Sequence, residues 1–179
     1  LLVWSSCGSA LDSFGNAFYL TNHYSPVPRV NVDIVPFMTG WGQTAVVMTA
    51  AGETILVSEN ADIRHDMIVA GSVMASRDVY AETAAALRAA GLDRTRVGLV
   101  GASCMPVAAW QAIRRELPDV EFVSADSILF GRRMLKSAAE IEHMRHASAI
   151  GCEIQNAMLS RAEVGARDTD LALEGMRVC

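Results

Sequence analysis

Apolar residues along this chain repeat with two different periods. Residues 44–49 and 53–58 are two short apolar runs on either side of Ala50, Ala51 and Gly52, which is the pattern of a β-hairpin. Beyond residue 137, apolar side chains instead recur every three or four positions over roughly six helical turns, with charged residues between them. This second pattern predicts a long amphipathic helix that ends near residue 159.

The rest of the chain predicts short strands that alternate with helices. Strands are expected at residues 1–5, 14–21, 32–37, 72–76, 96–100 and 120–123, and helices within 60–69, at 79–90, 106–117 and 126–135, and from residue 168 onward. The expected N-caps of these helices are Asn60 or Asp62, Asp78, Asp126, and Asp168 or Thr169. Helix 106–117 is expected to bury Val107, Trp110, Ile113 and Leu117. This order predicts an α/β fold with a mixed β-sheet flanked by helices on both faces.

The long helix is predicted to begin at a capping box formed by Ser137 and Glu140, whose spacing lets each side chain bond to the other's backbone amide. We interpret this helix as a junction. Residues 1–135 form one complete domain, and residues 136–179 form the helical start of a truncated second domain. The apolar side of the helix, which carries Ile141, Met144, Ile154 and Met158, is therefore expected to pack on another copy or to fray.

Composition narrows the class of protein. The 179 residues are 51% hydrophobic and carry a net charge of −5, which allows a sizeable core and gives no basic surface for nucleic acid. No apolar run reaches the roughly 18–20 residues that a membrane span needs. The first residues are expected to belong to a strand that the sequence enters part-way, rather than to a signal peptide. Four scattered cysteines are expected to be free thiols in the cytoplasm.

Two segments partly resemble catalytic motifs, but each lacks a residue that the motif requires. Residues 101–105 follow a strand and contain Ser103, but Met105 stands where a nucleophile elbow needs glycine. Glu140 and His143 share a helical face as in di-metal bundles, yet no matching carboxylate helix is present, so a solvated polar face is the better interpretation. We expect no catalytic residue and no metal ligand in this chain.

A proline-rich loop is the remaining candidate for recognition. Pro26 and Pro28 make residues 22–29 stiff and extended. The candidate substrate-proximal residues displayed on or near this loop are His23, Tyr24, Arg29 and Trp41. Arg29 could bind a substrate carboxylate with its planar guanidinium. The alternative is an ordinary surface loop with a packed tyrosine and tryptophan.

Several segments resemble, in the same order, the N-terminal part of the creatinase/prolidase/aminopeptidase P family of pita-bread metallohydrolases. They are Ala17-Phe18-Tyr19-Leu20-Thr21, the hairpin at 44–58, Val97-Gly98-Leu99-Val100-Gly101, and the pattern made by Arg133, Lys136, Ser137, Glu140, Ile141, Met144, Arg145 and Ala147. The last pattern is similar to the family's opening of the catalytic domain. Asn22 departs from the family, which often has glycine there.

The resemblance implies an N-terminal domain that supports homodimerisation and helps to close an active site. It also implies a catalytic domain with two Asp, one His and two Glu around two divalent metals (Mn, Co or Zn), although creatinases carry out similar hydrolysis without metal. None of these ligand motifs is matched here, so no cofactor is expected in this chain.

Three functions remain open at this point. The first is the non-catalytic N-terminal domain of a cytoplasmic hydrolase that cleaves C–N bonds of a small amide, dipeptide or guanidino substrate, without nucleic-acid or membrane partners. The second is a stand-alone dimerisation or binding module with no enzyme activity. The third is a doubly wound enzyme with its site after Val100, near Ser103 and Cys104.

Overall fold

A computed structural model describes residues 1–6, 12–23, 42–59 and 64–178 of the chain. The chain forms two compact units, Leu1–Gly131 and Arg132–Cys179. The predicted strand at 32–37 and the proposed caps Asn60 and Asp62 lie outside the described residues.

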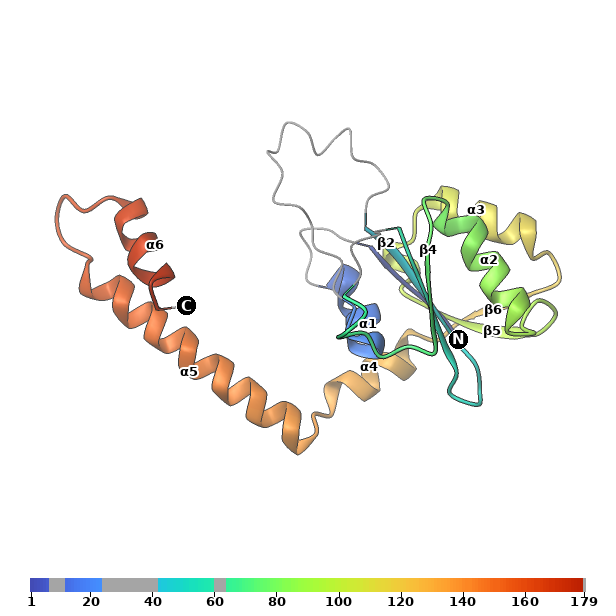
Figure 1. Cartoon of the computed structure of the whole chain (residues 1–179), viewed down its shortest axis with the longest axis horizontal. Helices are drawn as coiled ribbons and strands as arrows, with labels where there is room; N and C mark the ends of the chain where they lie inside the picture. The colour runs from blue at the N-terminus through green and yellow to red at the C-terminus, as the bar shows by residue number, and fades with distance from the viewer. Residues whose placement is uncertain (7–11, 24–41, 60–63, 179) are drawn as a thin grey trace. The chain divides into compact units, whose positions relative to one another are not determined.

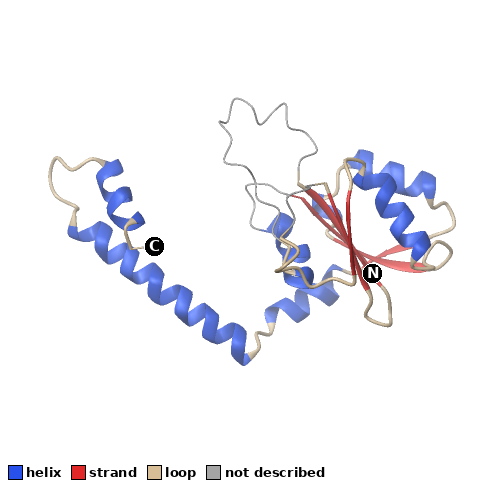
Figure 2. Cartoon of the chain, viewed as in Figure 1, coloured by secondary structure: helices blue, strands red, loops and turns tan. Residues whose placement is uncertain are grey.

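The first unit is built on a six-stranded sheet (Figures 1 and 2). Its strands are β1 (Leu2–Ser6), β2 (Gln43–Met48), β3 (Thr54–Ser58), β4 (Ser72–Ala75), β5 (Arg96–Val100) and β6 (Glu121–Ser124), in the order β4-β3-β2-β1-β5-β6. Strand β2 runs antiparallel to both of its neighbours, and the other three pairs are parallel. The hairpin predicted at 44–58 is confirmed as β2 and β3, and the sheet is mixed as the sequence predicted.

Helices cover both faces of this sheet, which confirms the predicted fold class. Alternate residues of each strand point to opposite faces, so each face of the sheet contributes side chains to its own hydrophobic core. Helices α2 (Val79–Ala89) and α3 (Val107–Glu116) pack on the face that carries Trp4 and Val57. Helices α1 (Asp12–Thr21) and α4 (Asp126–Met134) pack on the face that carries Val3 and Leu56.

The predicted strand at 14–21 is wrong, because this segment lies within helix α1. Its aromatic composition favours a strand locally, but its burial has a helical period. Ala17 and Thr21, four positions apart, are buried against the sheet, whereas Phe18 and Tyr19 are 44% and 41% exposed. Tertiary packing of the helical face therefore overrides the local propensity.

Three further predictions need correction. Val107 is 70% exposed, because α3 begins at this residue, whereas the predicted core residues Ile113 and Leu117 are buried, and so is Ala109. Residues 64–69 form a turn rather than a helix. Asp126 lies inside the first turn of α4, and its carboxylate accepts a hydrogen bond from the Gly101 amide at 2.7 Å instead of capping the helix.

The second unit consists of α5 (Ala138–Ser160) and α6 (Asp168–Met176). The predicted capping box is confirmed, since the Ser137 amide donates to the Glu140 carboxylate at 2.7 Å and the Glu140 amide donates to the Ser137 hydroxyl at 3.2 Å. The N-cap of α6 is Arg167, so neither Asp168 nor Thr169 caps it.

Helix α6 covers part of the apolar side of α5. A Cβ placed on Gly175 would lie 3.0–3.1 Å from side-chain atoms of Met158 and Ile154, so the two helices approach closely at this glycine. Met144, nearer the start of α5, is 57% exposed. Part of the face that the sequence predicted to lack a partner in this chain is therefore covered by α6.

Candidate functional site

Five of the six strands run in the same direction, so their carboxyl ends share one edge of the sheet. Strands β5 and β6 are parallel to β1, and β3 is parallel to β1 because both are antiparallel to β2. Strand β4 is parallel to β3. In open α/β sheets this carboxyl edge is where ligands generally bind, and it is where the one described candidate residue, His23, is found.

His23 is buried at this edge, with 4% of its surface exposed. Its Nε2 lies 3.1 Å from the Ser58 hydroxyl at the end of β3, and its amide donates to the Thr21 hydroxyl at 3.3 Å. Burial lowers the pKa of the imidazole below its ordinary value of 6.5, which favours the neutral ring. The sequence predicted a displayed side chain; the structure places it inside the unit, and its approach to a substrate stays a prediction.

A row of buried hydroxyl groups leads to His23. Ser5, Thr44 and Ser58 lie directly opposite one another across β1, β2 and β3, and their exposed fractions are 0%, 2% and 0%. The Ser5 hydroxyl accepts a hydrogen bond from the Ala17 amide of α1 at 3.0 Å. Sequence reasoning missed this row, although polar residues at inward positions of apolar strands were a usable signal.

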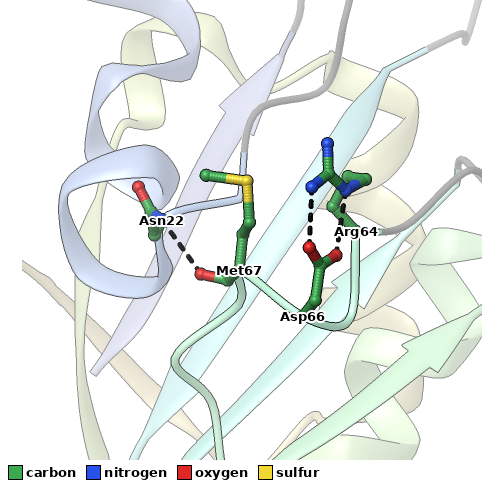
Figure 3. Close-up of polar contacts among 4 residues, drawn as sticks. All are labelled: Asn22, Arg64, Asp66 and Met67. Atoms are coloured by element: carbon green, nitrogen blue, oxygen red, sulfur yellow. Dashed lines mark hydrogen bonds and ion pairs between the residues drawn. The ribbon is translucent and has the colours of Figure 1, made fainter.

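The segment that precedes β4 is tied to the end of α1 (Figure 3). Asn22 has a positive φ of 55°, and its side-chain amide donates to the Met67 carbonyl at 2.9 Å. The Val69 amide donates to the Thr21 carbonyl at 2.8 Å. Arg64 and Asp66 form a two-bond ion pair in the same turn, at 2.6 and 2.9 Å.

The opposite face of the sheet carries a second polar group at this edge. The Trp4 indole donates to the side-chain oxygen of Gln43 at 2.9 Å, and the backbone amide of Gln43 donates to the Glu59 carboxylate at 3.3 Å. Burial raises the pKa of Glu59. The Tyr80 ring lies 6.0 Å from that of Trp4, and its pKa is raised by burial and then by the charges of Glu59 and Asp78. These contacts surround the fully buried Trp4 and the partly buried Tyr80, which is a structural role.

Ser103 and Cys104, the residues near the site of the third candidate function, are neighbours in one short turn. Both belong to a short 3₁₀ turn, η2 (Ala102–Cys104), after β5. The Cys104 thiol donates to the carbonyls of Gly101 and Trp4 at 3.2 and 3.7 Å, which favours the thiol over the nucleophilic thiolate.

The other candidate residues divide into two groups. Tyr24, Arg29 and Trp41 lie outside the described residues. Glu140 is committed to the cap of α5, and among the described residues no group of three or more His, Cys, Asp and Glu side chains could hold a metal ion. The described residues therefore do not fit the divalent metal that the resemblance implies for the catalytic domain.

No helix in the described ranges is both long enough and apolar enough to cross a membrane.

Comparison with known proteins adds to this geometry. The family model for the Creatinase/Prolidase N-terminal domain matches residues 12–135. Among solved structures, the chain is similar to the prolidase from Pyrococcus horikoshii OT3, with a TM-score of 0.68 and 14% identity. It is also similar to the prolidase from Pyrococcus furiosus (0.63, 14%) and to a dipeptidase from Pyrococcus horikoshii OT3 (0.62, 17%). No match was found among curated proteins.

The coverage of these structures is unequal. Each similarity spans 99% of this chain but 43%, 44% and 44% of the three solved chains, respectively. The chain thus corresponds to less than half the length of these proteins. At 14–17% identity the similarity shows a shared fold.

Proposed function

Because the chain belongs to the creatinase/prolidase N-terminal domain family, we propose that it is the non-catalytic N-terminal domain of a hydrolase. The hydrolase would cleave a C–N bond in a small amide, a dipeptide or a guanidino compound. The observation that carries this proposal is the family match over residues 12–135, which runs from α1 to just beyond α4 and so covers nearly all of the first compact unit.

Within such an enzyme the first unit has two proposed roles. It supports a homodimer, and it helps to close the active site by presenting the segment that carries Tyr24, Arg29 and Trp41. The position of His23 supports the second role, because this residue is anchored to Ser58 and the segment follows it directly. Arg29 is the residue proposed to bind a substrate carboxylate.

Catalysis itself is assigned outside this chain. The described residues supply no nucleophile with a base and an orienting group, and no metal-binding cluster. Any divalent metal, whether Mn, Co or Zn, would be held by the catalytic domain. We place the enzyme in the cytoplasm, where its scattered cysteines would stay reduced.

The test compares this 179-residue chain with the complete product of its gene. Both are assayed against Xaa-Pro dipeptides, creatine and simple amides with added Mn²⁺, and both are examined by sedimentation velocity. We expect hydrolysis only by the complete protein, and a dimer in both samples.

Two results would contradict the proposal. Hydrolysis by the chain alone would place a catalytic site within it. A complete gene product that forms dimers but has no hydrolase activity and no further domain would instead support a stand-alone dimerisation or binding module.

A further inference from the structure

Helix α1 is held on the sheet by polar contacts at two points. Near its middle, the Ala17 amide donates to the buried Ser5 hydroxyl. At its end, His23 meets the buried Ser58 hydroxyl, and the Thr21 hydroxyl links the two regions by donating to the Ala17 carbonyl at 2.8 Å and accepting from the His23 amide. The end of α1 is thus fixed to a strand 35 residues away through one imidazole ring.

The turn before β4 depends on the same helix end. Its contacts are those of Met67 with Asn22 and of Val69 with Thr21. The residues involved directly precede His23, so a displacement of His23 from Ser58 would also disturb this turn. We refer to α1 and residues 64–70 together as the fastened layer.

Among the residues that the structure describes, no carboxylate is placed to neutralise a positive His23 ring. On β1 and β2 the facing side chains are the hydroxyls of Ser5 and Thr44. On β3, Glu59 follows Ser58 and so points to the opposite face, where its charge acts on Tyr80.

The remaining ionisable groups near His23 belong to α1 and the turn. Over residues 15–21 of α1 the ionisable side chain is Tyr19, which is partly exposed to solvent. In the turn, the Asp66 carboxylate is bonded to Arg64, and His65 is exposed. A proton added to His23 would therefore create a buried charge that these described groups do not pair.

We propose that His23 is a proton-sensitive fastener, which holds the fastened layer on the sheet while its ring is neutral and releases it when the ring is protonated. The neutral ring can donate to or accept from the Ser58 hydroxyl through Nε2, so the contact needs no charge. The protonated ring regains hydration only when it leaves the sheet, and mild acid therefore favours the released state.

This device can be distinguished from general acid sensitivity because the chain has four histidines, and the other three are exposed. His65 provides a matched control, since it lies in the fastened layer but points to solvent. The variants are His23→Gln, which keeps a neutral hydrogen-bonding side chain, and His65→Gln.

The experiment measures backbone hydrogen exchange of the 179-residue chain at pH 7.4 and 5.2, corrected for intrinsic exchange rates. If the ring stays neutral on the sheet and titrates normally when released, opening of the fastened layer should increase by up to about 20-fold at pH 5.2. Exchange in β1 and α2, which requires opening of the whole unit, should stay much slower than exchange in the fastened layer at both pH values. His65→Gln should keep this response, and His23→Gln should lose it.

An NMR titration of the wild-type imidazole resonances provides a second readout that does not depend on the folding of any variant. We expect the His23 resonances to titrate with a midpoint below 6.5, together with the increase in exchange. A His23 midpoint at or above 6.5 would overturn the proposal. An unchanged acid response in a folded His23→Gln variant, or a fastened layer that exchanges no faster than β1 at pH 5.2, would overturn it as well.

Discussion

At the carboxyl edge of the sheet, the backbone of Gly101 lies close to the backbone carbonyl of Trp4, so a side chain at position 101 should lower the stability of the fold. Gly101 ends β5 with a φ of +82°, and a Cβ added there would lie 2.2 Å from the Trp4 carbonyl oxygen of β1. Gly52, in the β2–β3 hairpin, has a similar φ of +87°, but a Cβ there would have nothing within 4 Å. The pair Gly101→Ala and Gly52→Ala therefore separates the penalty for the backbone conformation from the penalty for the clash.

The expected magnitudes differ because only one penalty is shared. Placing alanine in the left-handed region costs about 1–2 kcal/mol, and the reduced freedom of the unfolded chain returns about 0.4–1 kcal/mol. Gly52→Ala should therefore lower the free energy of unfolding by about 1 kcal/mol. Gly101→Ala must also push β1 away from β5, because backbone atoms cannot rotate aside, and overpacking of this kind adds about 1–3 kcal/mol.

Urea unfolding at pH 7.4, followed by tryptophan fluorescence and circular dichroism, measures both losses. We expect Gly101→Ala to lose about 2–4 kcal/mol in total, and the extra loss of about 1–3 kcal/mol relative to Gly52→Ala corresponds to a difference of roughly 5- to 150-fold in the unfolding equilibrium. Equal losses in the two variants would show that the close approach to Trp4 carries no energetic weight, and would refute the reasoning.

Three other predictions follow from single side chains. Burial lowers the pKa of His23 below 6.5, so in acid the unfolded chain binds more protons than the folded chain. The free energy of unfolding of the wild type should therefore fall as the pH drops through 6.5 towards the folded pKa. The urea midpoints at pH 7.4 and 5.5 should differ more for the wild type than for His23→Gln. In the complete protein, Arg29→Ala should strongly raise the KM of the proposed hydrolysis with the fold intact, and an unchanged KM would remove Arg29 from the proposed site. Ser137→Ala should cost α5 about 0.5–2 kcal/mol, seen as faster amide exchange in its first turns, whereas the mid-helix Ser148→Ala should not.

Features encoded by neighbouring residues could be predicted from the sequence. The capping box at Ser137, the Asp78 cap of α2 and the hairpin around Gly52 all depend on contacts within a few positions, and all three are confirmed. The order of these local elements was enough to predict the mixed sheet with helices on both faces, because few topologies accommodate such an order.

Features encoded by distant residues could not be predicted in this way. Residues 14–21 contain aromatic side chains that suit a strand, and only the contact of Ala17 with Ser5 and the sheet reveals the helix. His23 was singled out as a polar residue beside a proline-rich loop, but its burial depends on a partner, Ser58, that is 35 positions away. The bond between Asp126 and Gly101 likewise spans 25 positions, which no local periodicity reports.

The two units also differ in what stabilises their helices. In the first unit each described helix buries side chains against the sheet, so its stability is tied to that of the whole core. Helix α5 has 23 residues and buries none of them, and the buried residue of α6 is Gly175. A helix of this kind is held within its unit by its cap and by its packing against α6, without a buried core like that of the first unit. The apolar period of α5 therefore predicts its helical conformation, while its resistance to opening depends on what covers Met144 and the exposed side chains around it.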